Sequence, residues 1–261
     1  MMAMPASAPL VQKGLVYEPK YDGIRALIEV APAASGARAR IWSRNGNDKT
    51  KQFPTVARAL DAAVRIAGPI VLDGEIVALD ERGRPAGFQR LQGRMHLAGT
   101  KDIERAEQIQ PVAFIAFDLL REGHDDLCAL PLRARRKRLE ALLAGVFRLT
   151  TAAKASAVKK AEATGTKRSK RAVSSSSSRF RLQAEGVIRL SEQVADDARA
   201  LHARAVKEGW EGLIAKDAAS TYQPGRRTPA WRKIKLLQQQ EFVVGGWTEP
   251  RETRQYFGAL L

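Results

Sequence analysis

The sequence predicts an α+β fold of mixed, largely antiparallel sheets with helices packed outside them. Segments with a strand-type composition outnumber the helical segments. The strand segments also follow one another without the regular alternation of strand and helix that builds parallel sheets. With 261 residues, the chain can bury a substantial core in one large domain, or in one domain and a smaller one.

Strands are predicted where β-branched and aromatic residues form short apolar runs. These runs are 25–30 (RALIEV), 40–44 (RIWSR), 70–79 (IVLDGEIVAL), 112–120 (VAFIAFDLL), 211–216 (EGLIAK), 231–236 (WRKIKL) and 241–247 (EFVVGGW). Residues 238–247 and 256–261 (YFGALL) look like the opening two strands of a small barrel. The chain ends within the second of them.

Helical spacing of apolar residues marks two further segments. Residues 130–146 predict a surface helix with basic side chains between its apolar positions. Those positions are Leu132, Leu139, Leu142 and Leu143. Residues 194–209 predict a second amphipathic helix, which Gly209 ends.

Basic charge is high and is concentrated in one segment. The formal net charge is 44 − 28 = +16, which favours a polyanionic partner such as nucleic acid, although membrane surfaces also attract basic proteins. Residues 150–181 hold nine Lys/Arg and one acid, so their net charge is 9 − 1 = +8. Because large apolar residues are almost absent there, we expect residues 150–180 to form a disordered basic insert.

Targeting and cysteine signals indicate a cytoplasmic protein. No apolar run reaches the roughly 20 residues that span a bilayer, and the N-terminal residues lack the pattern of a signal peptide. The single cysteine, Cys128, excludes an internal disulfide, and no Cys/His cluster has zinc-ligand spacing. Cys128 is therefore expected to be a small core residue.

Several polar motifs have ordinary structural explanations when each is taken alone. Asp-Gly and Asn-Gly pairs favour hairpin turns, charged strands protect sheet edges, and an aromatic residue in an apolar strand is most simply a core residue. These motifs are Asp22-Gly23, Asn45-Gly46, Asp73-Gly74, the strand WRKIK, the pair Glu211 and Lys216, and Phe117.

Together, the polar motifs point to a nucleotide. Lys233 and Lys235 share one face of a strand, where like charges repel unless an anion such as triphosphate lies beside them. Glu75 and Glu211 offer oxygen ligands suited to a magnesium ion that bridges phosphates. Phe117 ends an apolar run, where its ring could stack on a base.

Lys20 then gains a chemical role. An amine attacks only in its neutral form, which burial and neighbouring cations favour. Arg25, Arg44, Lys233, Lys235 and a bound metal ion would provide that environment. The implied reaction is attack of Lys20 on the α-phosphorus of a nucleoside triphosphate, giving a lysyl-nucleotide and pyrophosphate.

The ordered motifs resemble those of the covalent nucleotidyltransferases, which comprise ATP-dependent DNA ligases, RNA ligases and messenger-RNA capping enzymes. They are EPKYDGIRA, SRNG, DGEIV, FDLL, EGLIAK and WRKIK, in that order. The wording of the first motif, with LQGRM, QEFVVGG and FGALL, most closely resembles bacterial ATP-dependent DNA ligases, especially the ligase domain of the end-joining enzyme ligase D. The similarity runs from about Val16 to the last residue, apart from 150–180.

This resemblance implies two domains. Residues 1–236 would form the adenylation domain, with the nucleotidyltransferase fold of the ligases and the basic insert at 150–180. Residues 237–261 would begin an oligonucleotide-binding (OB-fold) barrel, which needs about five strands. Because only the start of such a barrel is present, ligase activity is expected to be impaired.

The resemblance also implies roles for the residues that match the nucleotide-binding motifs. Lys20 would be the adenylated nucleophile, and Glu18 would recognise the adenine amino group. Arg25 and Arg44 would contact the ribose and phosphates, and Arg44 would later hold the 5′-phosphate of DNA. Phe117 would stack on adenine.

Further roles concern metal, phosphate and DNA. Glu75 would bind the ribose hydroxyl or the metal ion, and Glu211 would be a metal ligand. Lys233 and Lys235 would grip the α-phosphate. Arg94, in LQGRM, would be a weak DNA contact.

The implied activity is that of an ATP-dependent DNA ligase in DNA repair and recombination, including non-homologous end joining. ATP and Mg²⁺ would be the cofactors, with Mn²⁺ as a substitute. The partners would be nicked or broken double-stranded DNA and end-joining proteins such as Ku, for a monomeric protein associated with the bacterial nucleoid. The alternatives are an RNA ligase or capping-type enzyme, which the first motif disfavours, and an inactive nucleic-acid-binding remnant.

Overall fold

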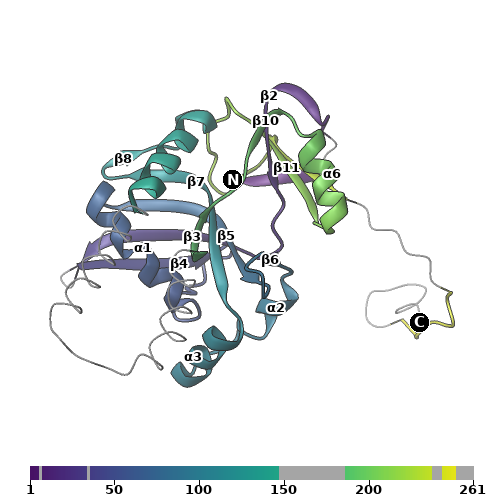
Figure 1. Cartoon of the computed structure of the whole chain (residues 1–261), viewed down its shortest axis with the longest axis horizontal. Helices are drawn as coiled ribbons and strands as arrows, with labels where there is room; N and C mark the ends of the chain where they lie inside the picture. Colours follow the sequence, from purple (N-terminus) through teal and green to yellow (C-terminus); the bar gives the residue numbers. More distant parts are fainter. Residues whose placement is uncertain (6–7, 34–35, 147–185, 237–242, 251–261) are drawn as a thin grey trace, which may run out of the picture.

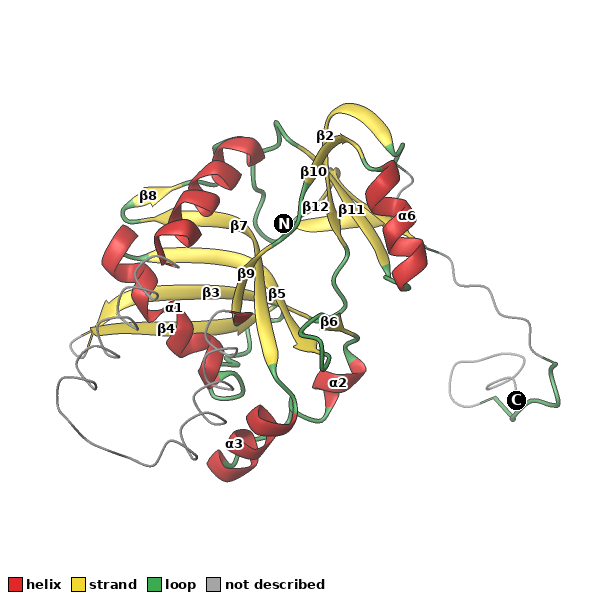
Figure 2. Ribbon diagram, in the orientation of Figure 1, coloured by secondary structure: helices red, strands yellow, loops and turns green. Residues whose placement is uncertain are grey.

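The computed structural model describes residues 1–5, 8–33, 36–146, 186–236 and 243–250. These residues form two sheets with helices on their outer faces (Figures 1 and 2). All but two of the strand pairs are antiparallel; Met2–Pro5 (β1) pairs in parallel with Arg227–Lys235 (β12), and Val112–Glu122 (β7) with Ile188–Leu190 (β9). The predicted α+β class with mixed, largely antiparallel sheets is therefore confirmed. The predicted insert, 150–180, lies outside the described residues.

The smaller sheet has five strands, drawn at the upper right in Figure 1. In spatial order they are β1 (Met2–Pro5), β12 (Arg227–Lys235), β11 (Gly212–Asp217), β2 (Val11–Pro19) and β10 (Val194–Asp197). Strand β12 therefore lies between two neighbours. The interpretation of WRKIK as a protected edge strand is wrong, and its lysines need another explanation.

The larger sheet has seven strands and lies at the left in Figure 1. Its main path is β4 (Gly36–Ser43), β3 (Ile24–Ala33), β5 (Ile70–Leu79), β7 (Val112–Glu122) and β8 (Asp125–Asp126). Strand β6 (Pro85–Ala86) pairs with β5, and β9 (Ile188–Leu190) pairs with β7. Alternation along β3 buries Ala26, Ile28 and Val30 in the main hydrophobic core.

Helices cover the sheets from outside. They are α1 (Pro54–Ala67), α2 (Gln89–Gln92), α3 (Thr100–Ile109) and α6 (Arg199–Glu208), and residues 132–146 are also helical. The four predicted apolar leucines of the 132–146 helix are all buried. Gly209 ends α6 in the left-handed conformation, with φ of 68°, as predicted. The first four residues of that predicted helix instead form β10. No helix in the described ranges is long and apolar enough to cross a membrane.

Two of the three predicted hairpin turns are wrong. Asp22-Gly23 joins β2 in one sheet to β3 in the other, so the flanking strands do not pair. Asp73-Gly74 lies in the middle of β5, beside a β-bulge. Asn45-Gly46 does form a turn, in which Gly46 has φ of +77° and its N–H donates to Ser43 O.

The expected barrel at 237–261 is not confirmed. Residues 237–242 and 251–261 lie outside the described residues, and residues 243–246 adopt no strand. Cys128 is half-buried against a small cluster with Leu120 and Trp231, and burial raises the pKa of its thiol to about 11.

Candidate active site

A pocket of about 200 Å³ opens where the two sheets meet. It lies beside the loop of residues 20–23, which carries the chain from β2 to β3. Seven predicted site residues line it: Glu18, Lys20, Arg25, Arg44, Glu75, Phe117 and Lys233. They come from both sheets and from the loops that end the strands, so the fold gathers them from distant parts of the sequence.

Lys20 is fixed at the mouth of this pocket by its own backbone. Its N–H donates to Gly212 O at 2.9 Å, which continues the pairing of β2 with β11. Its ammonium forms an ion pair with the carboxylate of Glu211, the residue just before β11. The Lys20 side chain is 14% exposed and the Glu211 side chain 38%, so both remain accessible to a ligand.

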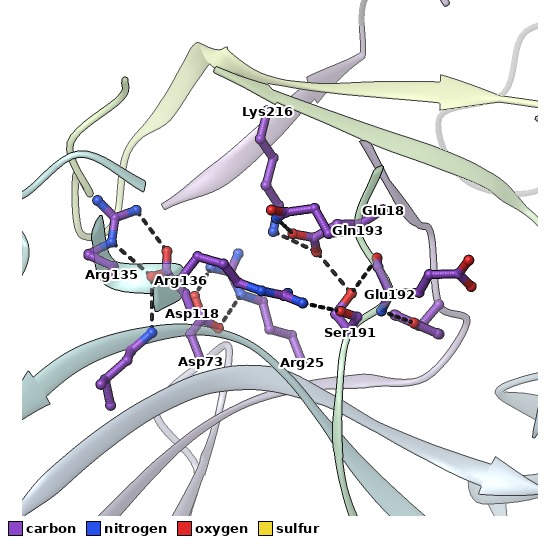
Figure 3. A network of polar contacts seen from close by, with 12 residues as sticks. Glu18, Arg25, Asp73, Asp118, Arg135, Arg136, Ser191, Glu192, Gln193 and Lys216 are labelled. Carbon is purple, nitrogen blue, oxygen red and sulfur yellow. Dashed lines mark hydrogen bonds and ion pairs between the residues drawn. The ribbon is translucent and has the colours of Figure 1, made fainter. Parts of the chain in front are cut away.

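Glu18 is buried, and its carboxylate accepts three hydrogen bonds. Its carboxylate accepts from Lys216 Nζ at 2.8 Å, Gln193 Nε2 at 2.8 Å and Ser191 Oγ at 3.0 Å. Figure 3 shows these donors converging on the carboxylate. Lys216 and Glu18 are each only 2% exposed. The interpretation of Lys216 as part of a solvated pair with Glu211 is therefore wrong, because Lys216 pairs with Glu18 inside the pocket wall.

Aromatic rings surround the Lys216 ammonium. Its Nζ lies 4.4 Å from the ring centroid of Phe117 and 4.2 Å from that of Trp231. The two rings meet edge to face at 6.0 Å. Trp231 is 3% exposed, and its indole N–H makes no hydrogen bond to any described residue. The pocket wall therefore offers two sources of hydrogen-bond donors: further N–H groups of the Lys216 ammonium, and the unsatisfied indole N–H of Trp231.

Arg25 is held by a buried carboxylate. It donates to Asp73 through Nε at 3.0 Å and through Nη2 at 2.6 Å, a bidentate geometry. Tyr222 O–H donates to the same carboxylate at 2.8 Å and accepts from Arg25 Nη2 at 3.2 Å. The guanidinium lies 5.8 Å from the ring centroid of Phe117. Asp73 and Tyr222 therefore fix the Arg25 guanidinium beside the predicted base-stacking ring.

A second buried ion pair, Arg135 with Asp118, lies beside the Arg25–Asp73 pair (Figure 3). Arg135 donates to both oxygens of Asp118 at 2.8 Å, and both side chains are fully buried. Arg135 also donates to the carbonyls of Leu130 and Ser220. This pair ties the 132–146 helix to β7 and to the loop after β11, which carries Tyr222.

Glu75 faces the pocket opposite Arg25 in the β3–β5 register. Burial raises the pKa of its carboxyl to about 8, and Asp73 adds to the rise, although Arg25 and Lys20 oppose it. The carboxyl therefore holds a proton near neutral pH until a cation compensates its charge. A metal ion is one such cation.

The two lysines of β12 differ in position. Lys233 lines the pocket, and burial together with the charges of Lys20 and Arg227 lowers the pKa of its amine. Lys235 shares the face of Lys233 but is exposed and lies outside the pocket lining. Lys233 is therefore the better placed of the two to meet a phosphate.

Arg94 is not placed for the predicted DNA contact. The residue is 3% exposed, and its guanidinium donates to Gln52 O, Gln110 O and the Glu107 carboxylate. It also lies over the Phe53 ring at 5.0 Å. These contacts make Arg94 a structural residue that packs α3 onto the body of the domain.

Sequence reasoning missed five residues that shape the site. They are Asp73, Ser191, Gln193, Tyr222 and Trp231. In addition, Lys216 was paired with Glu211, whereas its partner in the structure is Glu18. The available signal was weak: a lysine and an aspartate within apolar strands must find partners when buried, but the sequence does not say which.

Comparisons with known proteins identify one family of similar proteins. The chain matches the family model described as "ATP dependent DNA ligase domain" over residues 6–235. The chain belongs to this ATP-dependent DNA ligase family. Among curated relatives, the multifunctional non-homologous end joining protein LigD of Pseudomonas aeruginosa is 34% identical over 245 residues, or 94% of this chain. The DNA ligase of Natronomonas pharaonis is 31% identical over 90% of this chain.

Solved ligase structures agree with this assignment. The ligase domain of Mycobacterium tuberculosis LigD matches with a TM-score of 0.61 and 29% identity, covering 99% of this chain and 66% of that one. A mycobacterial DNA ligase D complexed with ATP matches with a TM-score of 0.60 and 27% identity, covering 95% and 63%. This ligase-family chain spans only 23% of the P. aeruginosa protein and 35% of the N. pharaonis protein.

Proposed function

We propose that this chain is the adenylation domain of an ATP-dependent DNA ligase and that Lys20 takes AMP from ATP. The observation that carries the proposal is the meeting of Lys20, Arg25, Glu75, Phe117 and Lys233 in one pocket, in a chain of the DNA ligase family. A related mycobacterial ligase D structure is described as a complex with ATP. The inactive remnant is disfavoured because every predicted nucleotide-binding residue except Lys235 lines the pocket, and the predicted metal ligand Glu211 pairs with Lys20.

The first step would form a nitrogen–phosphorus bond. The neutral amine of Lys20 attacks the α-phosphorus, the bond from that phosphorus to the bridging oxygen of the β-phosphate breaks, and pyrophosphate leaves with the electron pair. The ammonium proton must be lost beforehand, and the neighbouring Glu211 carboxylate is positioned to receive it. Lys233 and Arg44 would stabilise the negative charge on the phosphoryl oxygens.

The base would be read deeper in the pocket. Glu18 would accept from the adenine amino group, and Phe117 would stack on the ring, with Arg25 toward the ribose. Lys216 Nζ and Arg25 Cζ lie 4.4 and 5.8 Å from the Phe117 ring centroid, so both cations would border a base stacked on this ring. Glu18 supplies the acceptor that distinguishes adenine from a base with a carbonyl at that position.

Magnesium fits the carboxylates of this site. Among the described residues, His, Cys, Asp and Glu form no group of three or more that could hold a metal ion. Magnesium bound to a nucleotide needs only one or two carboxylates, because phosphates and waters complete its octahedron. Glu211 is exposed enough to serve, and Glu75 is a half-buried carboxyl in the pocket lining that a cation would ionise. Magnesium, or manganese in its place, would supply charge neutralisation of the phosphates.

DNA would be the second substrate. AMP would pass from Lys20 to a DNA 5′-phosphate held by Arg44, and the neighbouring 3′-hydroxyl would then displace AMP. The same proposal includes a nicked or broken duplex as substrate and end-joining proteins such as Ku as partners. It also includes a monomeric state and a cytoplasmic, nucleoid-associated location. The boundary near residue 236 and a catalytic role for Lys235 are further parts of it.

Covalent labelling tests the first step. The chain, incubated with α-labelled ATP and Mg²⁺ and separated under denaturing conditions, should retain label. Lys20→Ala should lose it entirely because no phosphoramidate can form. The matched control is Lys13→Ala, which removes an exposed lysine from β2, the strand that precedes Lys20, and should label like the parent. Label retained in Lys20→Ala, or a preference for GTP over ATP, would overturn the proposal.

A further inference from the structure

Strand β4 carries two arginines, Arg38 and Arg40, that the proposed adenylation reaction does not use. Its sequence alternates Arg38, Arg40 and Trp42, and Arg44 follows directly after its last residue. We call Arg38, Arg40 and Arg44 the arginine strip. Because side chains alternate along a strand, Arg38, Arg40 and Trp42 point to the same side of the larger sheet, and Arg44 begins the turn that follows the strand.

The arginine strip lies on the open face of that sheet. The intervening residues, Ala39 and Ile41, are buried in the main core. The two strip residues within β4 therefore face the opposite way, toward the side that carries Leu27 and the pocket residue Arg25 on the adjacent strand. Strand β4 is the last strand at its end of the sheet (Figure 2), so no further strand in the described residues covers this margin.

The strip runs outward from the pocket. Arg44 lines the pocket, whereas Arg40 and Arg38 lie progressively farther along β4. At about 3.3 Å per residue, the six-residue step from Arg44 to Arg38 covers about 20 Å. That length corresponds to roughly six nucleotides of one strand of B-form DNA at about 3.4 Å each.

The charges of the strip are not neutralised within the described chain. Arg38, Arg40 and Arg44 are exposed and make no ion pair with a described residue. Glu29 lies across from Arg40 in the register but does not reach ion-pair distance. Burial raises the pKa of nearby Asp48, but hydrogen bonds from Thr50 and the charges of Arg40 and Arg38 lower it overall.

We propose that the arginine strip is a track for the phosphate backbone of duplex DNA that leaves the active-site pocket. This proposal rests on the proposed ligase function and extends it to a DNA-contact surface on β4. A row of three cations that form no ion pair with a described residue fits a polymer of regularly spaced phosphates. Trp42, half-buried between Arg40 and Arg44, adds an apolar surface against sugar groups.

Edge protection is the alternative explanation of these arginines. Charged residues on an edge strand discourage pairing with a second chain, and that role needs no ligand. The two explanations differ in what removal of the charges does. Loss of a DNA track weakens DNA binding and its salt dependence, whereas loss of edge protection promotes self-association.

The test compares two double variants of the full chain. Arg38→Gln/Arg40→Gln removes the two strip residues outside the pocket. Lys101→Gln/Arg105→Gln removes the same charge from exposed positions on α3. Affinity for a nicked duplex is measured by fluorescence anisotropy over a range of salt concentrations, adenylation by labelled ATP, and self-association by light scattering.

Two lost phosphate contacts should reduce the slope of log affinity against log salt by about 1.8 and weaken binding by roughly tenfold to a hundredfold. Adenylation of this variant should match the parent, and the α3 variant should keep the parent slope. An unchanged slope, equal losses in both variants, or self-association alone would overturn the proposal. If the parent chain is never adenylated, the proposed function fails, but the DNA-binding comparison still decides the role of the strip.

Discussion

At the scale of single residues, the pocket is built from buried charges that are paired. Lys216 with Glu18 and Arg25 with Asp73 each bring an ionic partner into a region with little solvent. Removing such charges from water costs several kcal/mol per ion, and a well-packed apolar pair often gives equal or greater stability. These pairs therefore serve to position charges rather than to stabilise the fold. Each pair holds a cation near the Phe117 ring, where the base is expected.

Glu75 provides a pH-dependent test of this arrangement. Its pKa is raised from 4.5 to about 8 in the folded chain, so folding takes up a proton between these pH values. Its contribution to stability is complete below about pH 4.5 and is lost as the pH rises through about 8. Glu75→Gln cannot ionise, so its free energy of unfolding should exceed that of the parent increasingly from pH 5 to 9, reaching on the order of 2 kcal/mol.

The measurement is urea denaturation at a series of pH values. Glu81→Gln, which neutralises an exposed carboxylate in a turn, is the matched control and should follow the pH profile of the parent. If the stability difference between Glu75→Gln and the parent stayed constant from pH 5 to 9, the raised pKa of Glu75 would be refuted.

At the scale of elements, β5 connects the pocket to the core. It presents Asp73 and Glu75 to the pocket side and buries Leu72 and Ile76 in the main core. Between the two acids, Gly74 lets β7 approach closely. A Cβ at Gly74 would lie 2.4 Å from the Phe114 ring and 2.5 Å from Ile115 O. The glycine therefore serves close packing of two strands rather than a turn.

Gly74→Ala should therefore destabilise the chain by about 1–3 kcal/mol, the usual cost of overpacking in a core. It should also impair adenylation, because β5 must shift and carries Asp73 and Glu75 with it. Gly93→Ala is the control: Gly93 has φ of −63° and no atom within 4 Å of its Cβ position. That variant should be neutral or up to about 1 kcal/mol more stable. Equal unfolding midpoints for both variants would refute the packing argument.

Sequence patterns predicted strands better than their pairing. Residues 70–79 form a strand with the predicted bounds because β-branched residues fill a buried position in a sheet. The Asp-Gly pairs do not form the hairpin turns that the local pattern favours, because Asp22-Gly23 joins strands of different sheets and Asp73-Gly74 lies within one strand. Helices α1, α2 and α3 were not predicted.

The site was predicted only where a motif marked it. Seven of the predicted residues line the pocket, and they were found through their order along the chain. Lys216 was assigned a solvated position because its partner, Glu18, lies 198 residues away. Arg94 was assigned to DNA because its burial depends on α3 and the loop at Gln52, which no nearby residue indicates. Contacts of long sequence separation are decided by the whole fold.

At the scale of the whole molecule, two sheets meet at one pocket, and the short loop of residues 20–23 crosses between them. The smaller sheet contributes Glu18, Lys216 and Lys233, and the larger contributes Arg25 and Glu75. A relative movement of the sheets would change the distance between the Lys20 amine and the cations that must face the phosphates. In the proposed mechanism, the reaction therefore depends on the pocket where the two sheets meet and on Lys20 as its nucleophile.

The most direct test of this account is the position of the covalent adduct. The chain is incubated with ATP and Mg²⁺, digested, and its peptides are mapped by mass spectrometry. We predict one AMP per chain, on Lys20, and its removal when pyrophosphate is added, because the phosphoramidate step is reversible. The absence of any adduct, or an adduct on Lys216 or Lys233 instead of Lys20, would contradict the central claim.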